Sequence, residues 1–130
     1  MPTFLNPDTV HKPVGAYSHT AVVEAGTELV FVAGQVGIRK DGSTPNTFAE
    51  QAEVVFENLR ACLAAHGLGM QDVIKLNTYL VAGQDVQAMR AIRQSHFGMH
   101  QPTSTAVYVP ALVSPDLLLE VEAVAAKHSR

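Results

Sequence analysis

Two carboxylates near the end of the chain, Glu120 and Glu122, are the groups with the clearest capacity for chemistry. Residues 117–125 alternate in polarity, which predicts a strand. One face of this strand carries Leu117, Leu119, Val121, Ala123 and Ala125, and the other carries Leu118, Glu120, Glu122 and Val124. A carboxylate among apolar side chains needs a partner, a proton or water. We interpret the strand as one wall of a small-molecule site, with a partnered structural carboxylate at a subunit interface as the alternative.

The run before these carboxylates adds hydroxyl groups. Within residues 102–109, Ser104, Ala106 and Tyr108 share one face, and we expect that face to lie beside the carboxylates in a hairpin-like pair of strands. Ser104 and Thr105 would then offer a neutral hydroxyl pocket to the amide or carboxylate of a ligand. Alternatively, both are strand residues without a ligand. A nucleophilic serine is the weaker hypothesis, because no motif places a histidine beside it.

The earlier segments must position these strands. Residues 1–16 contain many turn formers and predict an irregular arm. Residues 17–24 and 28–33 predict two strands joined by a turn, and therefore a hairpin. Gly34 then interrupts the pattern, and a glycine here permits a bulge or a close approach of the backbone to another group.

Two helices are expected between the strands. Thr47, with Glu50 three residues later, has the spacing of a capping box, and the apolar stripe that follows ends near Gly67. Residues 72–80 predict a strand and residues 85–97 a second helix. This order favours an α+β fold with both helices on one face of a mixed sheet. The other face is half apolar, so we expect another subunit to cover it.

Composition narrows the class of function. The chain is long enough for one domain over residues 1–130, and its net charge of −3 with 47% hydrophobic residues is typical of a soluble globular protein. Its nine Lys and Arg are scattered, which argues against a nucleic-acid partner. Neither a signal peptide nor a membrane-spanning stretch is visible, so a cytoplasmic protein without a membrane partner is expected.

Metal and cofactor sites are not expected. The single cysteine, Cys62, lies close to the apolar stripe of the first helix, which favours a buried, inert thiol over a nucleophile. His96 and His100 are four residues apart, but Gly98 between them is expected to end the second helix. Their spacing therefore does not indicate a metal site.

Over nearly all of its length the chain resembles the Rid (reactive intermediate deaminase, YjgF-type) family. The matching segments are GAY at 15–17, VAGQ at 32–35, HGL at 66–68, DVIK at 72–75 and EVEAVA at 120–125. The resemblance implies the chorismate-mutase-like α+β fold and a homotrimer with clefts between neighbouring subunits. It also implies hydrolysis of enamines and imines, such as 2-aminoacrylate, to keto acids and ammonia.

The same resemblance implies roles for individual residues. Glu120 matches the cleft glutamate that acts on the attacking water, and Tyr17 matches the tyrosine at the cleft mouth, although an interface anchor is an equal alternative for Tyr17. Gly34 matches a glycine whose backbone approaches the ligand. Ala106 stands where many members have cysteine, and its backbone groups still reach the substrate-binding cleft.

Ser104 departs from the family pattern, because an arginine that grips the substrate carboxylate is implied at this position. Exchange of a bidentate charged clamp for one hydroxyl costs about 2–3 kcal/mol or more in binding. Classical 2-aminoacrylate deamination is therefore not expected. Arg90 or Arg93 on the second helix could replace the clamp from another side, and a solvated helix face is the alternative. Arg90 itself stands where an asparagine is common.

Two functions remain open. The first is a trimeric hydrolase of imines, enamines or related small amides with an altered substrate preference. The second is a non-catalytic trimer that binds a metabolite or regulates a partner. Ribonuclease activity is disfavoured by the acidic balance and the lack of a basic stripe. Chorismate mutase activity would need an arginine-rich site that this chain does not offer.

Overall fold

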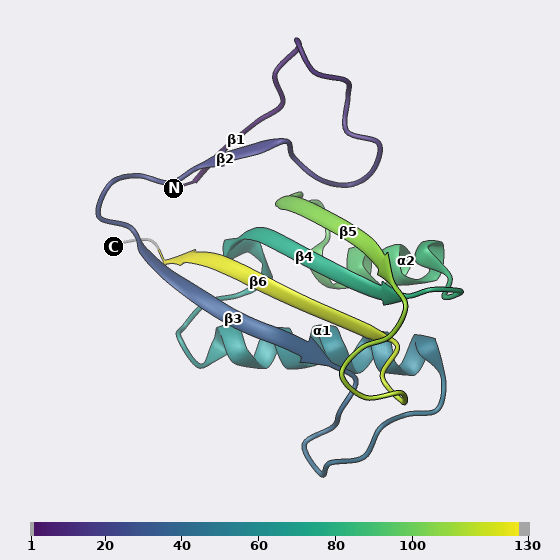
Figure 1. Cartoon of the computed structure of the whole chain (residues 1–130). Helices are drawn as coiled ribbons and strands as arrows, with labels where there is room; N and C mark the ends of the chain where they lie inside the picture. The colour runs from purple at the N-terminus through teal and green to yellow at the C-terminus, as the bar shows by residue number, and fades with distance from the viewer. Residues whose placement is uncertain (1, 128–130) are drawn as a thin grey trace.

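A mixed sheet with helices behind it forms the body of the protein (Figure 1). The structure is a computed structural model that describes residues 2–127. In chain order the elements are β1 (Thr3–Leu5), β2 (Thr20–Val22), β3 (Glu28–Val36), α1 (Phe48–Ala64), the 3-10 helix η1 (Met70–Asp72), β4 (Val73–Val81), α2 (Val86–Phe97), β5 (Thr103–Val109) and β6 (Leu119–Lys127).

The main sheet has the strand order β3-β6-β4-β5. Its last strand in sequence, β6, lies between β3 and β4 and runs antiparallel to both, whereas β5 is parallel to β4. Both α1 and α2 lie on the same side of this sheet and pack against each other (Figure 1). The expected α+β class, with both helices on one face of a mixed sheet, is confirmed.

The expected hairpin-like pairing of the last two strands is wrong. The α2 crossover returns the chain parallel to β4, so β5 takes one edge of β4. β6 occupies the other edge of β4. The two closing strands are therefore separated by a whole strand, and a side chain on β5 does not face a side chain on β6 directly.

The expected hairpin between residues 17–24 and 28–33 is also wrong. β2 covers only Thr20–Val22 and pairs in a two-stranded sheet with β1, which lies within the segment 1–16 that was expected to be irregular (Figure 1). Side chains fix this pairing: the Thr20 hydroxyl donates to the Leu5 carbonyl at 2.7 Å, and the His19 N–H donates to Asn6 Oδ1 at 2.7 Å. β3 pairs with β6 instead.

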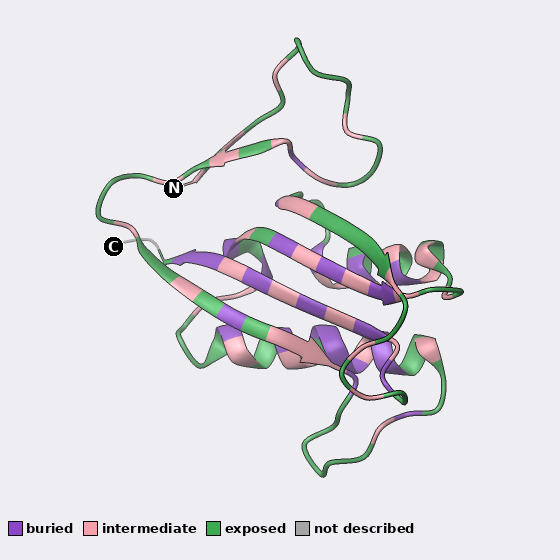
Figure 2. Ribbon diagram, viewed as in Figure 1, coloured by how far each residue is buried: buried purple, intermediate pink, exposed green. Residues whose placement is uncertain are grey.

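The core lies between the sheet and the helices. On α1 the predicted stripe is buried at Ala52, Val55, Phe56, Leu59 and Leu63. Alternate positions of β4 and β6 are buried against it, as the striped colouring of these strands shows (Figure 2). The predicted helix boundaries are confirmed: Thr47 Oγ1 accepts from the Glu50 N–H at 3.2 Å, and Gly67 and Gly98 adopt positive φ after the two helices.

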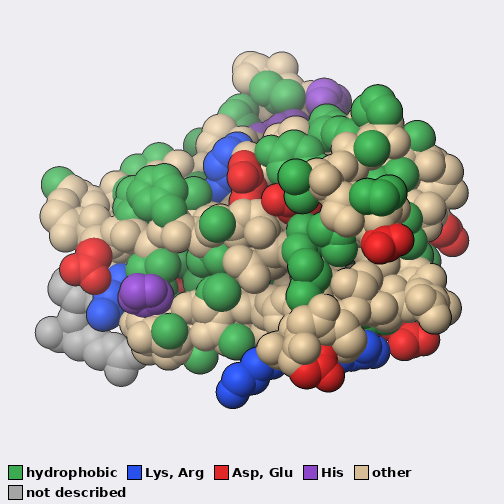
Figure 3. All heavy atoms as spheres, turned by 60° about the horizontal axis from the view of Figure 1, so that its bottom comes forward, with side chains coloured by type: hydrophobic (Ala, Val, Ile, Leu, Met, Phe, Trp, Pro, Cys, Tyr) green, Lys and Arg blue, Asp and Glu red, His purple; other side chains and the backbone are tan. Residues whose placement is uncertain are grey.

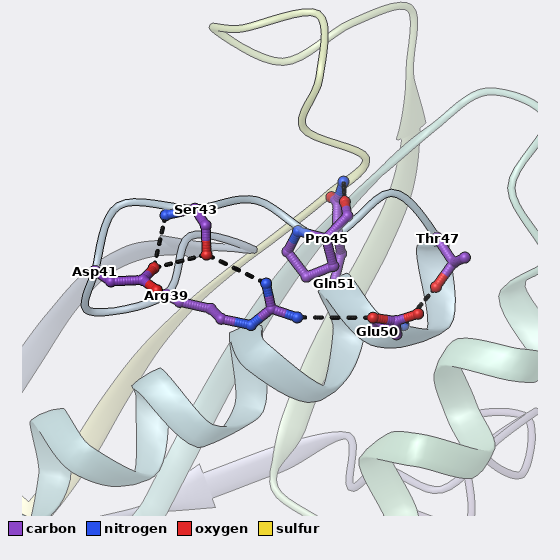
Figure 4. Close-up of polar contacts among 7 residues, drawn as sticks. All are labelled: Arg39, Asp41, Ser43, Pro45, Thr47, Glu50 and Gln51. Carbon is purple, nitrogen blue, oxygen red and sulfur yellow. Dashed lines mark hydrogen bonds and ion pairs between the residues drawn. The ribbon is translucent and has the colours of Figure 1, made fainter.

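A buried glutamine ties the start of α1 to the 111–118 loop, which connects β5 to β6. Gln51 Nε2 donates to the carbonyls of Pro45 at 3.1 Å and Asp116 at 2.8 Å, and Oε1 accepts from the Leu118 N–H at 2.9 Å. The loop before the helix is ordered nearby: Arg39 pairs with Glu50 (Figure 4). The N-terminal end of α1 therefore holds the loop through which the chain enters β6.

The sheet face turned away from the helices, here called the open face, is partly apolar. Phe31 of β3 is 75% exposed there, and Lys75, Asn77, Glu122 and Val124 lie around it in a shallow groove of about 470 Å³. Within residues 2–127 no helix combines the length and apolar character that a membrane span requires.

Candidate functional site

Gly34 lies directly against Glu120. The register between β3 and β6 shifts between Val32 and Gln35, which is a bulge at the predicted position. A Cβ atom placed on Gly34 would lie 2.7 Å from Cδ and 2.9 Å from Cγ of Glu120, and closer still to Oε2. The expectation of a bulge and a close backbone approach is confirmed, and the group approached is the candidate carboxylate itself.

The two carboxylates of β6 have different surroundings. Glu122 Oε1 accepts hydrogen bonds from Asn77 Nδ2 at 2.8 Å and from the Tyr79 hydroxyl at 3.2 Å. Glu120 has neither a hydrogen bond nor an ion pair with any residue in the described range 2–127. Glu122 is therefore a partnered structural group, and Glu120 is a carboxylate whose oxygens are available to water or a ligand.

Tyr79 lies between these carboxylates on the neighbouring strand, opposite Glu120 in the β4–β6 register. Burial raises the pKa of the Tyr79 hydroxyl, and the negative charges of Glu122 and Glu120 raise it further. The phenol therefore keeps its proton and remains a hydrogen-bond donor. The sequence predicted the strand that carries Asn77 and Tyr79, but not that these two side chains would bind Glu122 and leave Glu120 without a partner.

Glu120 borders an open cavity of about 380 Å³. Tyr79, Val109 and Glu122 line this cavity from the sheet, and Ala111, Leu112 and Val113 line it from the 111–118 loop. Because Gln51 holds this loop, the cavity shape depends on the contact between α1 and the loop. A carboxylate at such a wall can orient a water molecule, accept its proton, or bind a cationic or N–H group of a ligand.

Ser104 lies on the other side of the sheet, which corrects the expected placement. β5 pairs with β4 so that Ser104 is opposite Leu76, whose side chain is buried under the helices. The face of Ser104, Ala106 and Tyr108 is therefore the helix face. Thr105, opposite Asn77, is on the open face with the carboxylates. The expectation failed because the register between two strands decides which of their side chains share a face of the sheet. The sequence of one strand does not reveal that register.

Ser104 lies beside residues of α2. It lines a very small cavity of about 10 Å³ together with Arg93 of α2, between Leu76, Phe97 and Pro102. Arg93 is buried, whereas Arg90 is half-buried. Of the two arginines considered as replacements for a clamp, the structure brings Arg93 to Ser104. Ala106 is exposed further along the same strand.

Tyr17 lies in the N-terminal arm, away from Glu120. Its hydroxyl accepts from the Val14 N–H at 3.3 Å, and its ring meets the His19 ring edge-on. It borders a separate cavity of about 570 Å³ formed mostly by the arm. Ser18 attaches this part of the arm to the start of β5, because its hydroxyl donates to the Gln101 carbonyl at 2.7 Å. One copy of the chain thus brings Gly34 to Glu120 and Ser104 to Arg93, but leaves Tyr17 apart from Glu120.

The fold and this glutamate-lined cavity define a small α+β protein with a candidate small-molecule site. Residues 9–127 match the family described as Endoribonuclease L-PSP. The RutC family protein PH0854 of Pyrococcus horikoshii is 38% identical over 118 residues, which are 89% of this chain and 90% of that protein. The chain therefore belongs to this family, which includes the Rid and YjgF-type proteins.

Solved structures agree with this assignment. The Rid-family protein YyfB of Yersinia pestis matches with a TM-score of 0.85 and 27% identity, over 97% of this chain and 98% of that one. Escherichia coli TdcF, in a crystal structure with bound serine, matches with a TM-score of 0.73 and 27% identity, over 97% of this chain and 99% of that one. The expected family and its chorismate-mutase-like fold are thus confirmed.

Proposed function

We propose that this protein hydrolyses imines, enamines or related small amides of organic acids, with a substrate preference shifted from that of classical family members. The contrast between Glu120 and Glu122 is the observation that carries this proposal. Glu122 is held by Asn77 and Tyr79, while Glu120 is left free at the wall of a cavity, beside a glycine that makes room for it. The name of the related protein TdcF, which is that of a reactive intermediate deaminase, supports the same chemistry.

The chemistry follows from an available carboxylate beside a bound imine. Glu120 accepts a proton from a water molecule while the water oxygen bonds to the imine carbon and the C=N double bond becomes single. The proton then passes to the nitrogen. As the remaining hydroxyl proton also moves to the nitrogen, the C–N bond breaks, ammonia leaves, and the oxygen forms the new carbonyl of a keto acid. An enamine enters the same sequence after protonation of its carbon gives the imine.

The proposed working unit is a homotrimer in which neighbouring copies complete each site. Two features support this. The open face is apolar enough to be covered, with Phe31 largely exposed in a single chain. Tyr17 and Ser104 lie away from the Glu120 cavity in one copy, so a second copy would have to supply them. We propose no metal or cofactor for this reaction.

We do not propose a nucleic-acid partner, although the family description includes ribonuclease activity. The chain carries a net charge of −3. On the face drawn in Figure 3, positive side chains lie in separate spots among acidic, neutral and apolar groups. A nucleic-acid backbone is normally bound by a continuous basic surface.

The test is the release of ammonia and pyruvate from freshly generated 2-aminoacrylate, and of ammonia from imines of other small keto acids. We expect turnover with at least one of these substrates, and a loss of about a hundredfold or more in Glu120→Gln, because general-base catalysis contributes about that much. Glu57→Gln, an exposed carboxylate on α1, is the matched control and should keep the wild-type rate. Equal rates in wild type, Glu120→Gln and buffer would contradict the proposal.

Ser104 stands where the family resemblance implies an arginine that binds the substrate. This difference favours a second candidate function, a trimer that binds a metabolite without converting it. A thermal-shift screen with keto acids and neutral amides separates the two functions. Ligands that raise the melting temperature of a chain that turns over none of the substrates would favour binding alone.

A further inference from the structure

Gln51 is a buried amide that joins the start of α1 to the chain that enters β6. Only 1% of the residue is exposed. Its Nε2 donates to the carbonyls of Pro45 at 3.1 Å (Figure 4) and Asp116 at 2.8 Å, and its Oε1 accepts from the Leu118 N–H at 2.9 Å. Three of the four hydrogen bonds open to an amide are therefore made. A buried polar group that is satisfied in this way fixes the segments that it joins relative to one another.

The hydrogen bond from Leu118 lies two residues from Glu120. The Leu118 backbone is held on both sides, because its N–H donates to Gln51 and its carbonyl accepts from the Val81 N–H at 3.1 Å. A strand advances about 3.3 Å per residue with a fixed alternation of side chains, so a shift at one residue passes to its neighbours. The position of Leu118 therefore sets where the Glu120 side chain leaves β6.

The same side chain lies against the end of β3. Gly37 follows this strand directly, and a Cβ atom placed on it would lie 2.8 Å from both Cβ and Cγ of Gln51. Asn58, two turns later on α1, donates from Nδ2 to the carbonyls on either side of this glycine, those of Val36 at 3.2 Å and Ile38 at 2.9 Å. α1 thus holds the end of β3 as well as the entry to β6.

We propose that Gln51 is a positioning residue for Glu120, because it fixes the two strand ends that bring this carboxylate against Gly34. The proposal rests on the proposed function for the role of Glu120 as the base. The contact between Gly34 and Glu120 leaves no room for movement, since one added Cβ atom would overlap the carboxylate. Gln51 also holds the 111–118 loop, from which apolar side chains line the same cavity. Loss of this amide therefore changes the base and its cavity together.

The position of the carboxylate is tested first without turnover. In the full chain, Gln51→Leu should move the ¹³Cδ resonance of Glu120, because the start of its strand is no longer held. Leu63→Ala is the matched control, since it destabilises the core through a cavity about 18 Å further along α1. This control should leave the Glu120 resonance in place. Equal movement in the two variants, or none in Gln51→Leu, would overturn the proposal.

Turnover gives the second test. Gln51→Leu should lower kcat about ten- to hundredfold, the size of effect expected when a catalytic group is misplaced, whereas Leu63→Ala should keep the wild-type kcat below its melting temperature. In a Glu120→Gln background, Gln51→Leu should lower kcat no further but should still lower the melting temperature. The same fractional loss of kcat in both backgrounds would show that Gln51 acts apart from Glu120, and the proposal would fail.

Gly37→Ala covers the case in which Gln51→Leu does not fold. The added methyl group presses on Cβ and Cγ of Gln51 but leaves the amide in the chain, and the φ of Gly37 does not require glycine. The Glu120 resonance should move and kcat should fall, and a variant unchanged in both would refute the positioning role. If wild type hydrolyses none of the substrates while Gln51→Leu or Gly37→Ala moves the Glu120 resonance, the proposed function fails and the positioning role stands.

Discussion

The backbone of Gly34 lies so close to the side chain of Glu120 that a residue with a Cβ atom does not fit beside this carboxylate without moving it. The bulge in β3 creates this contact, and the start of β6 supplies the carboxylate. The position of the candidate catalytic group is therefore set by the absence of a side chain on another strand.

Gly34→Ala should displace the Glu120 carboxylate and reduce turnover roughly a hundredfold, since small misplacements of a catalytic group have effects of that size. Stability should change little, because Glu120 is not in the core. Ammonia release and thermal melting measure the two quantities. In a double-mutant cycle, Gly34→Ala should add almost nothing in a Glu120→Ala background. Additive effects of the two substitutions would show that Gly34 acts by another route.

Gln51→Leu should lower the free energy of unfolding by about 2–4 kcal/mol, because each buried partner left without a hydrogen bond costs about 1–3 kcal/mol. The partners are the carbonyls of Pro45 and Asp116 and the N–H of Leu118. Urea unfolding measures the loss. Gln87→Leu, at an exposed position of α2, is the control and should stay within about 0.5 kcal/mol of wild type. A similar loss in both variants would contradict the role of Gln51.

Tyr79 should make stability fall at alkaline pH. Its pKa is raised in the folded protein above the ordinary value of 10.0, so the folded state holds this proton more tightly than the unfolded chain does. The corresponding stabilisation is present below pH 10.0 and is lost as the pH rises through the folded pKa. Urea unfolding on both sides of pH 10.0 should show this loss in wild type and in Tyr108→Phe. An undiminished loss in Tyr79→Phe would rule out Tyr79 as its source.

Phe31→Asp should convert the expected homotrimer to monomers, because the substitution places a charge on the apolar part of the open face. Sedimentation velocity measures the change. Ala61→Asp, at an exposed position of α1 on the opposite side of the molecule, is the control and should leave the assembly intact. A wild-type chain that sediments as a monomer would contradict the trimer and with it the shared site.

Local patterns predicted most of the elements and little of their pairing. The Thr47 cap, the glycine ends of both helices and the two faces of residues 117–125 are properties of neighbouring residues, and the structure confirms them. The hairpin expected at residues 17–24 and the pairing of the last two strands both failed. Partners far apart in the chain decide those contacts, and adjacent residues carry little information about them.

The sequence by itself determined the fold class, the core stripe of α1 and the glycine that interrupts the third strand, since each depends on residue type and periodicity. The resemblance to the family added the expectation of an arginine where this chain has Ser104. The tertiary structure alone decided what these residues meet. It placed Ser104 on the helix face beside Arg93, bound Glu122 to Asn77 and Tyr79, and left Glu120 free. Those outcomes follow from strand order and register, because a shift of one residue or one strand turns the same side chain toward different neighbours.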